Sequence, residues 1–404
     1  MKENASLEYS KSKWTIVRIF RTFFLVLCWI IVVPITLLVL GAHANFIPYL
    51  GTIGTTIASV ISWVLVLSLL IGLLVGWFWI QNRNRASLIL SIMALLSCVG
   101  CLIISGRMIA TANDNGAHIN LFQTLKPAVS TDISEETVVY SSYDNEPLKL
   151  EIYRPLTGNS NEQHPVLMYV HGGGWIMGSR LDHQSDMRWF AEQGWLVISV
   201  DYTLSTKERN LWDITEGQIA CAMTWAGQNA KNYGGDISRF AMIGDSAGGN
   251  LVLNTSYQAN QGTLKSASGG EVPKVVAVST IYPVVDPSSF YNNPNELFGS
   301  AGRNMIESYI GGAPNQYPER YKAIQSDTHI TPYAPPTFIL VGERDHLVPP
   351  KATYDFTEKV RKAGVDIKQV IMPYSDHGFD LIHGSIGSQT FLQLSQQWFK
   401  QHGL

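Results

Sequence analysis

The sequence predicts an α/β protein with a mostly parallel, eight-stranded sheet, preceded by three transmembrane helices. Two observations lead to this fold class. Residues 1–105 contain three long apolar stretches without a charged residue, whereas residues 137–404 alternate short apolar strands with helical patterns. Such an alternation is typical of a parallel sheet with helices on both faces. Residues 106–136, which are polar and aperiodic, predict a linker or a short capping segment.

The apolar stretches are Phe23–Ala42, Ile57–Ile80 and Ala86–Ser105. A helix needs about 20 apolar residues to cross a bilayer, and each stretch supplies them. Pathways for ions or polar solutes usually need ionisable groups within the membrane, and none of the three stretches contains one. The N-terminal region is therefore predicted to be an integral membrane anchor with three spans.

Flanking charge predicts the orientation of the anchor. Five basic residues precede the first span, none lies between Gly41 and Thr56, and Arg83 and Arg85 fill the second turn. Because basic residues stay on the cytoplasmic side, the N-terminus should be cytoplasmic and everything after the third span extracytoplasmic. In an alternative interpretation, Ala42-His43-Ala44 is a cleavage site and the first span is a signal peptide, which leaves the C-terminal part outside as well.

Composition excludes some functions for the rest of the chain. The net charge is −3 and no basic cluster follows the spans, so a nucleic-acid surface is not expected. Of the four cysteines, only Cys221 lies outside the apolar stretches, so the soluble part has no internal disulfide to form.

Eight strands are expected after residue 136, and the middle ones are the near-continuous apolar runs of strands covered on both faces. They are Thr137–Tyr140, Lys149–Tyr153, Val166–Val170, Leu196–Asp201, Phe240–Ile243, Val275–Thr280, Thr337–Val341 and Lys368–Met372. Helical patterns at Trp212–Asn229 and Lys351–Ala363 separate some of them. Residues 286–330, rich in Asn, Pro, Gly and Tyr, interrupt the alternation and predict a lid-like insertion.

A nucleophilic serine is predicted where the fifth strand meets the next helix. Residues 244–248 read Gly-Asp-Ser-Ala-Gly, directly after the apolar strand Phe240–Ile243. A G-x-S-x-G turn at a strand-to-helix junction holds its serine exposed in a strained bend, and the glycines keep the bend free of clashes. Ser246 is therefore the candidate nucleophile.

A glycine turn at the end of an earlier strand predicts anion stabilisation. Residues 171–175 read His-Gly-Gly-Gly-Trp after the strand Val166–Val170. Acyl transfer places negative charge on the carbonyl oxygen, which backbone N–H groups stabilise where glycines allow a close approach.

A serine nucleophile needs a base, and the base needs an orienting acid. His377 follows the last predicted strand, and Asp345 lies four residues beyond the strand Thr337–Val341. The order Ser246, Asp345, His377 is the order in which α/β-hydrolases carry their triad. The competing candidates are His383 and His346 for the base, and Glu343 and Asp376 for the acid.

Residues 137–404 resemble an α/β-hydrolase of the hormone-sensitive-lipase-like esterase group, and are also similar to small feruloyl and acetyl esterases. The motifs at 171–175 and 244–250, Asp201-Tyr202, and residues 233–236 (Tyr-Gly-Gly-Asp) carry the resemblance jointly. It implies an oxyanion hole formed by the N–H groups of Gly172, Gly173 and Ala247. Residues 204–208 (Leu-Ser-Thr-Lys-Glu) depart from the proline-containing stretch that the family usually has there, which affects the expected pocket shape. The membrane region lies outside the resemblance.

These features predict a membrane-anchored serine hydrolase that cleaves small-molecule carboxylic esters through an acyl-enzyme on Ser246, without a metal or an organic cofactor. The same residues could cleave an amide, a formamide or a peptide. In a different class, the domain could be an inactive part of a membrane scaffold or transporter. The acyl and alcohol groups and the oligomeric state are not predicted.

Overall fold

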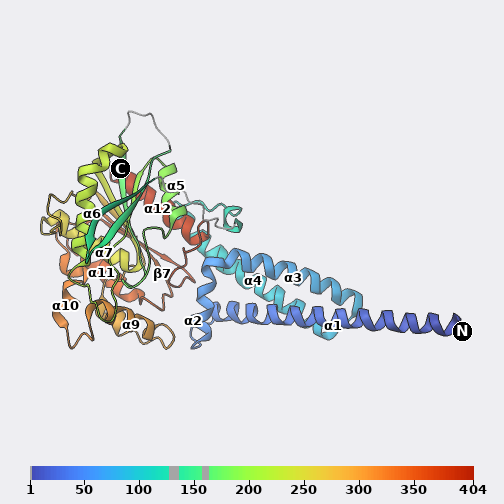
Figure 1. The fold of residues 1–404 in the computed structure, drawn as a ribbon. Coiled ribbons are helices and arrows are strands. Elements are labelled where there is room, and N and C mark those ends of the chain that lie inside the picture. Colours follow the sequence, from blue (N-terminus) through green and yellow to red (C-terminus); the bar gives the residue numbers. More distant parts are fainter. Residues whose placement is uncertain (1, 127–135, 157–162) are drawn as a thin grey trace. The chain divides into compact units, whose positions relative to one another are not determined.

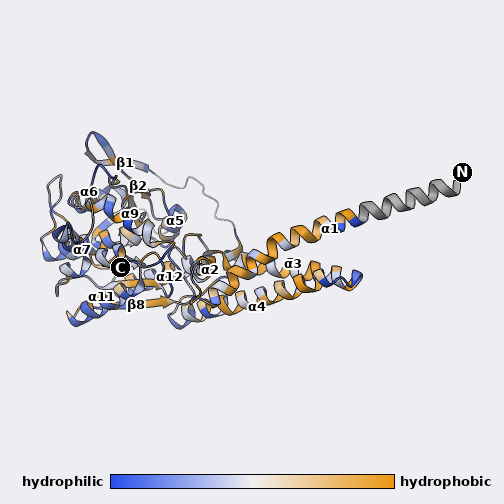
Figure 2. Cartoon of the chain, turned by 90° about the horizontal axis from the view of Figure 1, so that it is seen from below, coloured by the Kyte–Doolittle hydropathy of each residue, from blue (hydrophilic) through white to orange (hydrophobic). Residues whose placement is uncertain are grey.

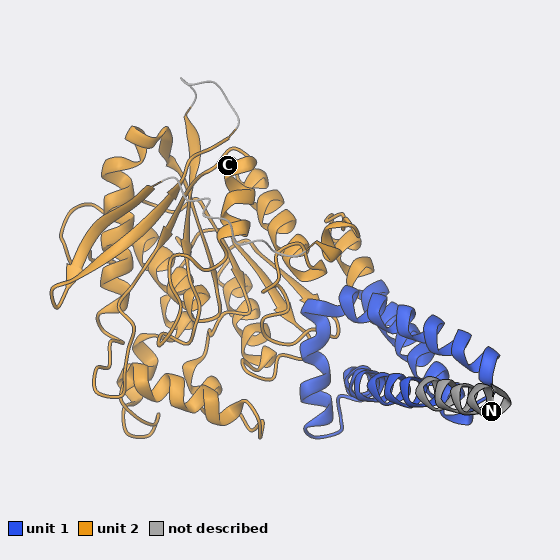
Figure 3. Cartoon of the chain, turned by 45° about the vertical axis from the view of Figure 1, so that its right-hand side comes forward, with its two compact units in different colours: residues 1–107 blue, residues 108–404 orange. Residues whose placement is uncertain are grey.

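The computed structural model describes residues 2–126, 136–156 and 163–404. These residues form two compact units, 1–107 and 108–404, drawn in separate colours in Figure 3.

The first unit is helical. Its elements are α1 (Lys2–His43), α2 (Leu50–Thr55), the 3-10 turn η1 (Thr56–Val60), α3 (Ile61–Asn82) and α4 (Arg85–Asp114). Among the described residues, three helices are long and apolar enough to cross a membrane, and Figure 2 shows their hydrophobic colouring. Within this unit α3 and α4 approach closely at Gly72. The Oγ of Ser91 in α4 donates a hydrogen bond of 3.4 Å to the carbonyl of that glycine in α3.

The end of α4 differs from the prediction. The third apolar stretch ends at Ser105 in sequence, but the helix continues to Asp114, so the first part of the predicted linker 106–136 is helical. A helix does not have to end where its apolar run ends, because its backbone hydrogen bonds do not depend on the polarity of the side chains. Residues 127–135 of the predicted linker lie outside the described residues.

The second unit contains one eight-stranded sheet with the order β1-β2-β4-β3-β5-β6-β7-β8 (Figure 1). Its strands are β1 (Glu136–Tyr143), β2 (Glu146–Tyr153), β3 (His164–Val170), β4 (Leu196–Val200), β5 (Gly235–Asp245), β6 (Ala277–Ile281), β7 (Thr337–Gly342) and β8 (Ile367–Met372). β1 and β2 form a hairpin, β2 pairs antiparallel with β4, and all remaining pairs are parallel. The predicted fold class and all eight predicted strands are thus present.

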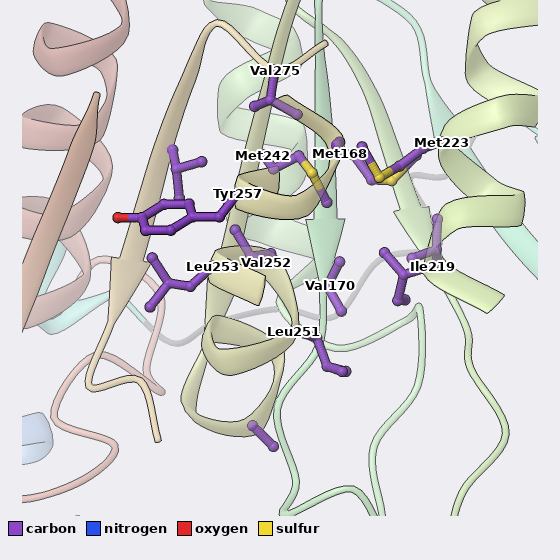
Figure 4. Packing of buried hydrophobic residues seen from close by; sticks show 14 of the residues in the cluster. Met168, Val170, Ile219, Met223, Met242, Leu251, Val252, Leu253, Tyr257 and Val275 are labelled. Carbon is purple, nitrogen blue, oxygen red and sulfur yellow. The ribbon is translucent and has the colours of Figure 1, made fainter. Parts of the chain in front are cut away.

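Helices cover both faces of the sheet. One face carries α6 (Thr215–Asn229), α7 (Ser246–Gln261) and α11 (Pro350–Lys362), and the other carries α5 (Gln184–Glu192) and α12 (Ile386–Gln401). Figure 4 shows the core between the sheet and α7, where Val170, Met242 and Leu251 are fully buried. Removing a side chain such as Leu251 from this core by mutation to alanine should cost about 2–5 kcal/mol. The helices therefore hold the strand ends that carry the site in a rigid frame.

The predicted insertion, residues 286–330, is folded. It contains α8 (Pro287–Tyr291), α9 (Gly299–Ile310), α10 (Pro318–Ala323) and the 3-10 turn η4 (Ser326–His329). Asp286 begins α8 by accepting hydrogen bonds from the backbone N–H groups of Ser288 and Ser289, which caps the helix. The irregular composition of this stretch is therefore that of short capped helices.

Candidate active site

Ser246 stands at the junction of β5 and α7, in the strained turn that the sequence predicts. Its φ is +50°, a left-handed conformation that a residue with a side chain rarely adopts. The following helix approaches β3 so closely that a Cβ on Gly248 would lie 2.1 Å from the carbonyl oxygen of Val170. The glycine is thus required by close packing, and this packing maintains the strained serine conformation.

The structure brings Ser246, His377 and Asp345 together. Nε2 of His377 lies 3.0 Å from Oγ of Ser246, and Nδ1 lies 2.8 Å from Oδ2 of Asp345. With the Nδ1 proton directed at the carboxylate, Nε2 is the bare nitrogen and can accept the serine proton. The other carboxylate oxygen of Asp345 accepts the backbone N–H groups of Leu347 and Val348 at 3.0 and 2.7 Å. Both carboxylate oxygens of Asp345 therefore have hydrogen-bond partners, which fix the orientation of the side chain.

The competing candidates have other partners. Nδ1 of His346 contacts Oδ2 of Asp376 at 2.7 Å, and Nδ1 of His383 contacts Oδ1 of Asp186 at 2.6 Å. Glu343 accepts the backbone N–H of Tyr374. The arrangement around Ser246 thus uses the first-choice residues for base and acid.

Asp376 connects the loop of the acid to the loop of the base, a feature that sequence reasoning did not predict. This buried carboxylate accepts the backbone N–H groups of His346 and His377, each at 2.8 Å. His346 follows the acid Asp345 directly, so the Asp376 carboxylate holds the loop of Asp345 next to the loop of His377. Only its position directly before His377 could have suggested this role.

Electrostatics prepare His377 to receive a proton. Burial of the ring lowers its pKa, but the charge of Asp345 and the hydrogen bond to it outweigh burial, and the pKa of His377 lies above its ordinary value. Burial also raises the pKa of the Asp345 carboxyl, and His377 opposes that rise. The ring centroids of Tyr282 and His377 are 4.2 Å apart, and the Tyr282 hydroxyl donates a hydrogen bond to Asp380. The fixed tyrosine ring limits the movement of the base.

The glycine turn differs from the prediction at Gly172. Its N–H donates a hydrogen bond of 3.0 Å to Oδ1 of Asp245, which also accepts the Tyr169 hydroxyl at 2.8 Å. The prediction of Gly172 as an oxyanion donor is therefore wrong, because its N–H is already used to dock the turn on the residue before the nucleophile.

Three N–H groups near Ser246 have no hydrogen-bond partner among the described residues. Gly173 and Gly174 lie in the turn with φ of +97° and +60°, and Ala247 lies in the first turn of α7, where N–H groups have no partner within the helix. Two of the three predicted donors, Gly173 and Ala247, thus remain available.

Two methionines pack against the glycine turn. A Cβ on Gly174 would lie 2.6 Å from Sδ of Met305, which the insertion supplies from α9, and a Cβ on Gly173 would lie 3.0 Å from Cγ of Met177. Trp175, the next residue of the turn, stacks on Tyr309 of α9 with ring centroids 4.6 Å apart. The side of the turn at Gly173 and Gly174 is therefore packed by methionine side chains. The described residues include no cluster of histidine, cysteine and acidic side chains suited to a metal ion.

Comparisons with known proteins find esterases among the relatives of this chain. The BD-FAE family model matches residues 150–360. The chain is 29% identical over 227 residues to esterase LipC of Mycobacterium tuberculosis, covering 55% of this chain and 54% of the relative. It is 30% identical over 257 residues to carboxylesterase NlhH of the same organism, covering 61% of this chain and 75% of the relative.

The chain spans about half the length of LipC. Among solved structures, an esterase of Thermogutta terrifontis with bound propionate superposes with a TM-score of 0.56. The alignment covers 68% of this chain and 96% of that one at 24% identity, and it supports the fold.

Proposed function

Because the chain belongs to the BD-FAE family and its relatives support the hormone-sensitive-lipase-like group of α/β-hydrolases, we propose that it is a membrane-anchored serine carboxylesterase that acts through an acyl-enzyme on Ser246. The observation that supports the mechanism best is His377 within hydrogen-bond distance of both Ser246 and Asp345. The curated relatives named as esterases support an ester as the substrate.

In the proposed first step, Oγ of Ser246 attacks the ester carbonyl while its proton moves to Nε2 of His377. Asp345 stabilises the imidazolium that forms. The tetrahedral intermediate then collapses, the bond to the alkoxy group breaks, and His377 returns the proton to the departing alcohol. Water repeats the sequence on the acyl-enzyme and releases the carboxylic acid. Asp376 acts as a positioning residue, since it holds the loops of His377 and Asp345 together.

The oxyanion of both intermediates is proposed to rest on the N–H groups of Gly173, Gly174 and Ala247. These three are free of partners among the described residues, whereas that of Gly172 is not. Preorganised N–H donors of this kind act on charge that appears only in the transition state, and each contributes about 10²–10³ in kcat. Asp245 supports the hole indirectly because it anchors the turn through Gly172.

The N-terminal helices are proposed to cross the membrane with the N-terminus in the cytoplasm and the hydrolase unit outside. Three long apolar helices support membrane association, and the basic residues before the first span together with Arg83 and Arg85 support this orientation.

Two assays on the same full-length protein test the proposed ester hydrolysis and the proposed membrane orientation. The full-length chain is produced in bacterial cells, and turnover of p-nitrophenyl esters with graded acyl lengths is compared with turnover of the matching anilides. Ester turnover that disappears in Ser246→Ala is expected, with anilide turnover far lower. Protease added to intact cells should cut the hydrolase unit. Preferential anilide cleavage would replace esterase by amidase, and a hydrolase unit cut only after lysis would reverse the orientation.

A further inference from the structure

Large apolar side chains are exposed next to the loop that carries His377. Phe122 is 84% exposed, Leu121 58%, Leu381 65% and Leu181 43%. We call these four residues the apolar rim. Leu181 and Leu381 line one open hollow of about 190 Å³ together with His383. Soluble proteins rarely gather large exposed apolar side chains without a binding function.

The two halves of the rim are joined by hydrogen bonds. Nε2 of Gln389, in the first turn of α12, donates to the carbonyls of Asn120 and Gly384 at 3.1 and 2.7 Å. Asn120 precedes Leu121 directly, and Gly384 lies three residues after Leu381. The segment with Leu121 and Phe122 is therefore fixed beside the loop 381–384.

Three glutamines of α12 hold this segment in place. Gln389, Gln393 and Gln397 are spaced by four residues, so they share one helix face. Their side chains bind the backbone of Asn120, His118 and Gly116, with five hydrogen bonds between 2.7 and 3.1 Å. Alternate residues of an extended chain lie about 6.6 Å apart, and helix residues spaced by four lie about 6 Å apart along the axis, so the two repeats nearly match. The segment is thus built to dock on the hydrolase unit.

The same segment follows α4 directly. α4 ends at Asp114, and the eight residues from there to Phe122 can span at most roughly 26–29 Å. α4 has 30 residues and is about 45 Å long, whereas the apolar layer of a bilayer is about 30 Å thick. If α4 spans the membrane, about 15 Å of the helix can extend beyond the lipid, so the rim must lie within roughly 41–44 Å of the point where the chain leaves the lipid.

We propose that the apolar rim inserts into the outer surface of the bilayer that holds α4, and that the enzyme takes its ester from the lipid phase. The inference rests on the proposed function, because it uses both the membrane anchor and the site at His377. A bilayer is the occupant that the chain itself brings to this surface. The glutamine clasp, formed by Gln389, Gln393 and Gln397, fixes the rim segment from Gly116 on, two residues after the end of the apolar helix α4. The substrate class would then be membrane-resident esters with long acyl chains.

The first test locates the rim. Phe122→Cys is labelled with an environment-sensitive fluorophore in the full-length protein, reconstituted in phosphatidylcholine vesicles containing nitroxide-labelled lipid. The four native cysteines are buried, so the new thiol is the reactive one. Tyr333→Cys is the matched control: it is 70% exposed and lies four residues before β7, whereas Asp345 follows the other end of that strand. Quenching at 122 but not at 333 is expected, and equal quenching at both positions, or none at 122, would overturn the proposal.

The second test measures turnover. The double variant Leu121→Ser, Phe122→Ser should hydrolyse a long-chain ester embedded in the vesicles at least ten-fold more slowly than the wild type. Its hydrolysis of a water-soluble acetate ester should be unchanged. The control Tyr333→Ser should hydrolyse both esters at the wild-type rate. Equal rates of the double variant and the wild type on the embedded ester would refute the inference. If the wild type cleaves no ester, the proposed function fails, and the quenching result still decides whether the rim meets lipid. Concentration-dependent dimers that cover the rim and prevent quenching would assign it to a second copy instead.

Discussion

Replacing Gly173 by alanine tests whether the glycine turn stabilises the transition state or merely shapes the pocket. A Cβ at this position would lie 2.1 Å from the carbonyl oxygen of Met177, and the residue has a φ of +97°. A left-handed conformation costs a residue with a side chain about 1–2 kcal/mol, and the clash is with backbone, so the turn has to move. A displaced N–H donor should cost about 2.7–4 kcal/mol in the barrier.

The assay is the steady-state hydrolysis of a short ester together with the rate at which a fluorophosphonate labels Ser246. We expect kcat to fall by about 10²–10³ and labelling to slow, with KM little changed, because the donors act on charge that develops after binding. Gly262→Ala is the matched control: Gly262 has a φ of +84° at the end of α7 and no atom within 4 Å of its added Cβ. It should lower stability by about 1 kcal/mol and leave kcat unchanged. A raised KM with unchanged kcat in Gly173→Ala would refute the assigned role.

Three further predictions concern the base, the acid and the residue that connects them. His377→Ala should damage kcat about as much as the loss of Ser246, and Asp345→Asn somewhat less; an active His377→Ala together with an inactive His383→Ala would move the base. The pKa of His377 lies above its ordinary value of about 6.5, so kcat/KM should fall as the pH drops through that raised pKa and the ring becomes protonated. In Asp345→Asn this fall in kcat/KM should occur at lower pH. Asp376→Ala removes the acceptor of two backbone N–H groups and should lower the free energy of unfolding by about 1–3 kcal/mol for each of them. It should also lower kcat more than it changes KM. An unchanged kcat would make the residue purely structural.

The sequence predicted the sheet well because its middle strands are continuous apolar runs. β3, β6 and β7 are fully or almost fully buried along their length, and a run of that kind between polar turns has few other uses. The strand ends were harder to place: β5 begins at Gly235, five residues before the apolar run. Only Gly235 and Asp236 of this extension pair with β3, before a register shift, and the pairing partner of a polar residue cannot be predicted from its own strand.

The triad candidates followed from chain order, but the use of each N–H group did not. Gly172, Gly173 and Gly174 are identical in sequence, and only the fold shows that Asp245 takes the N–H of the first. The glutamine clasp escaped prediction for a similar reason. Its two partners are more than 260 residues apart, and neither an extended segment nor three glutamines on a helix indicates the other.

The central claim, that Ser246 is a nucleophile activated by His377, is tested most directly by covalent labelling of the full-length protein. A fluorophosphonate should add once to the wild type, and peptide mapping should place the adduct on Ser246. His377→Ala should label far more slowly, and Ser246→Ala, correctly folded by circular dichroism, should not label at all. An adduct that persists in Ser246→Ala, or a His377→Ala variant that labels at the wild-type rate, would contradict the mechanism.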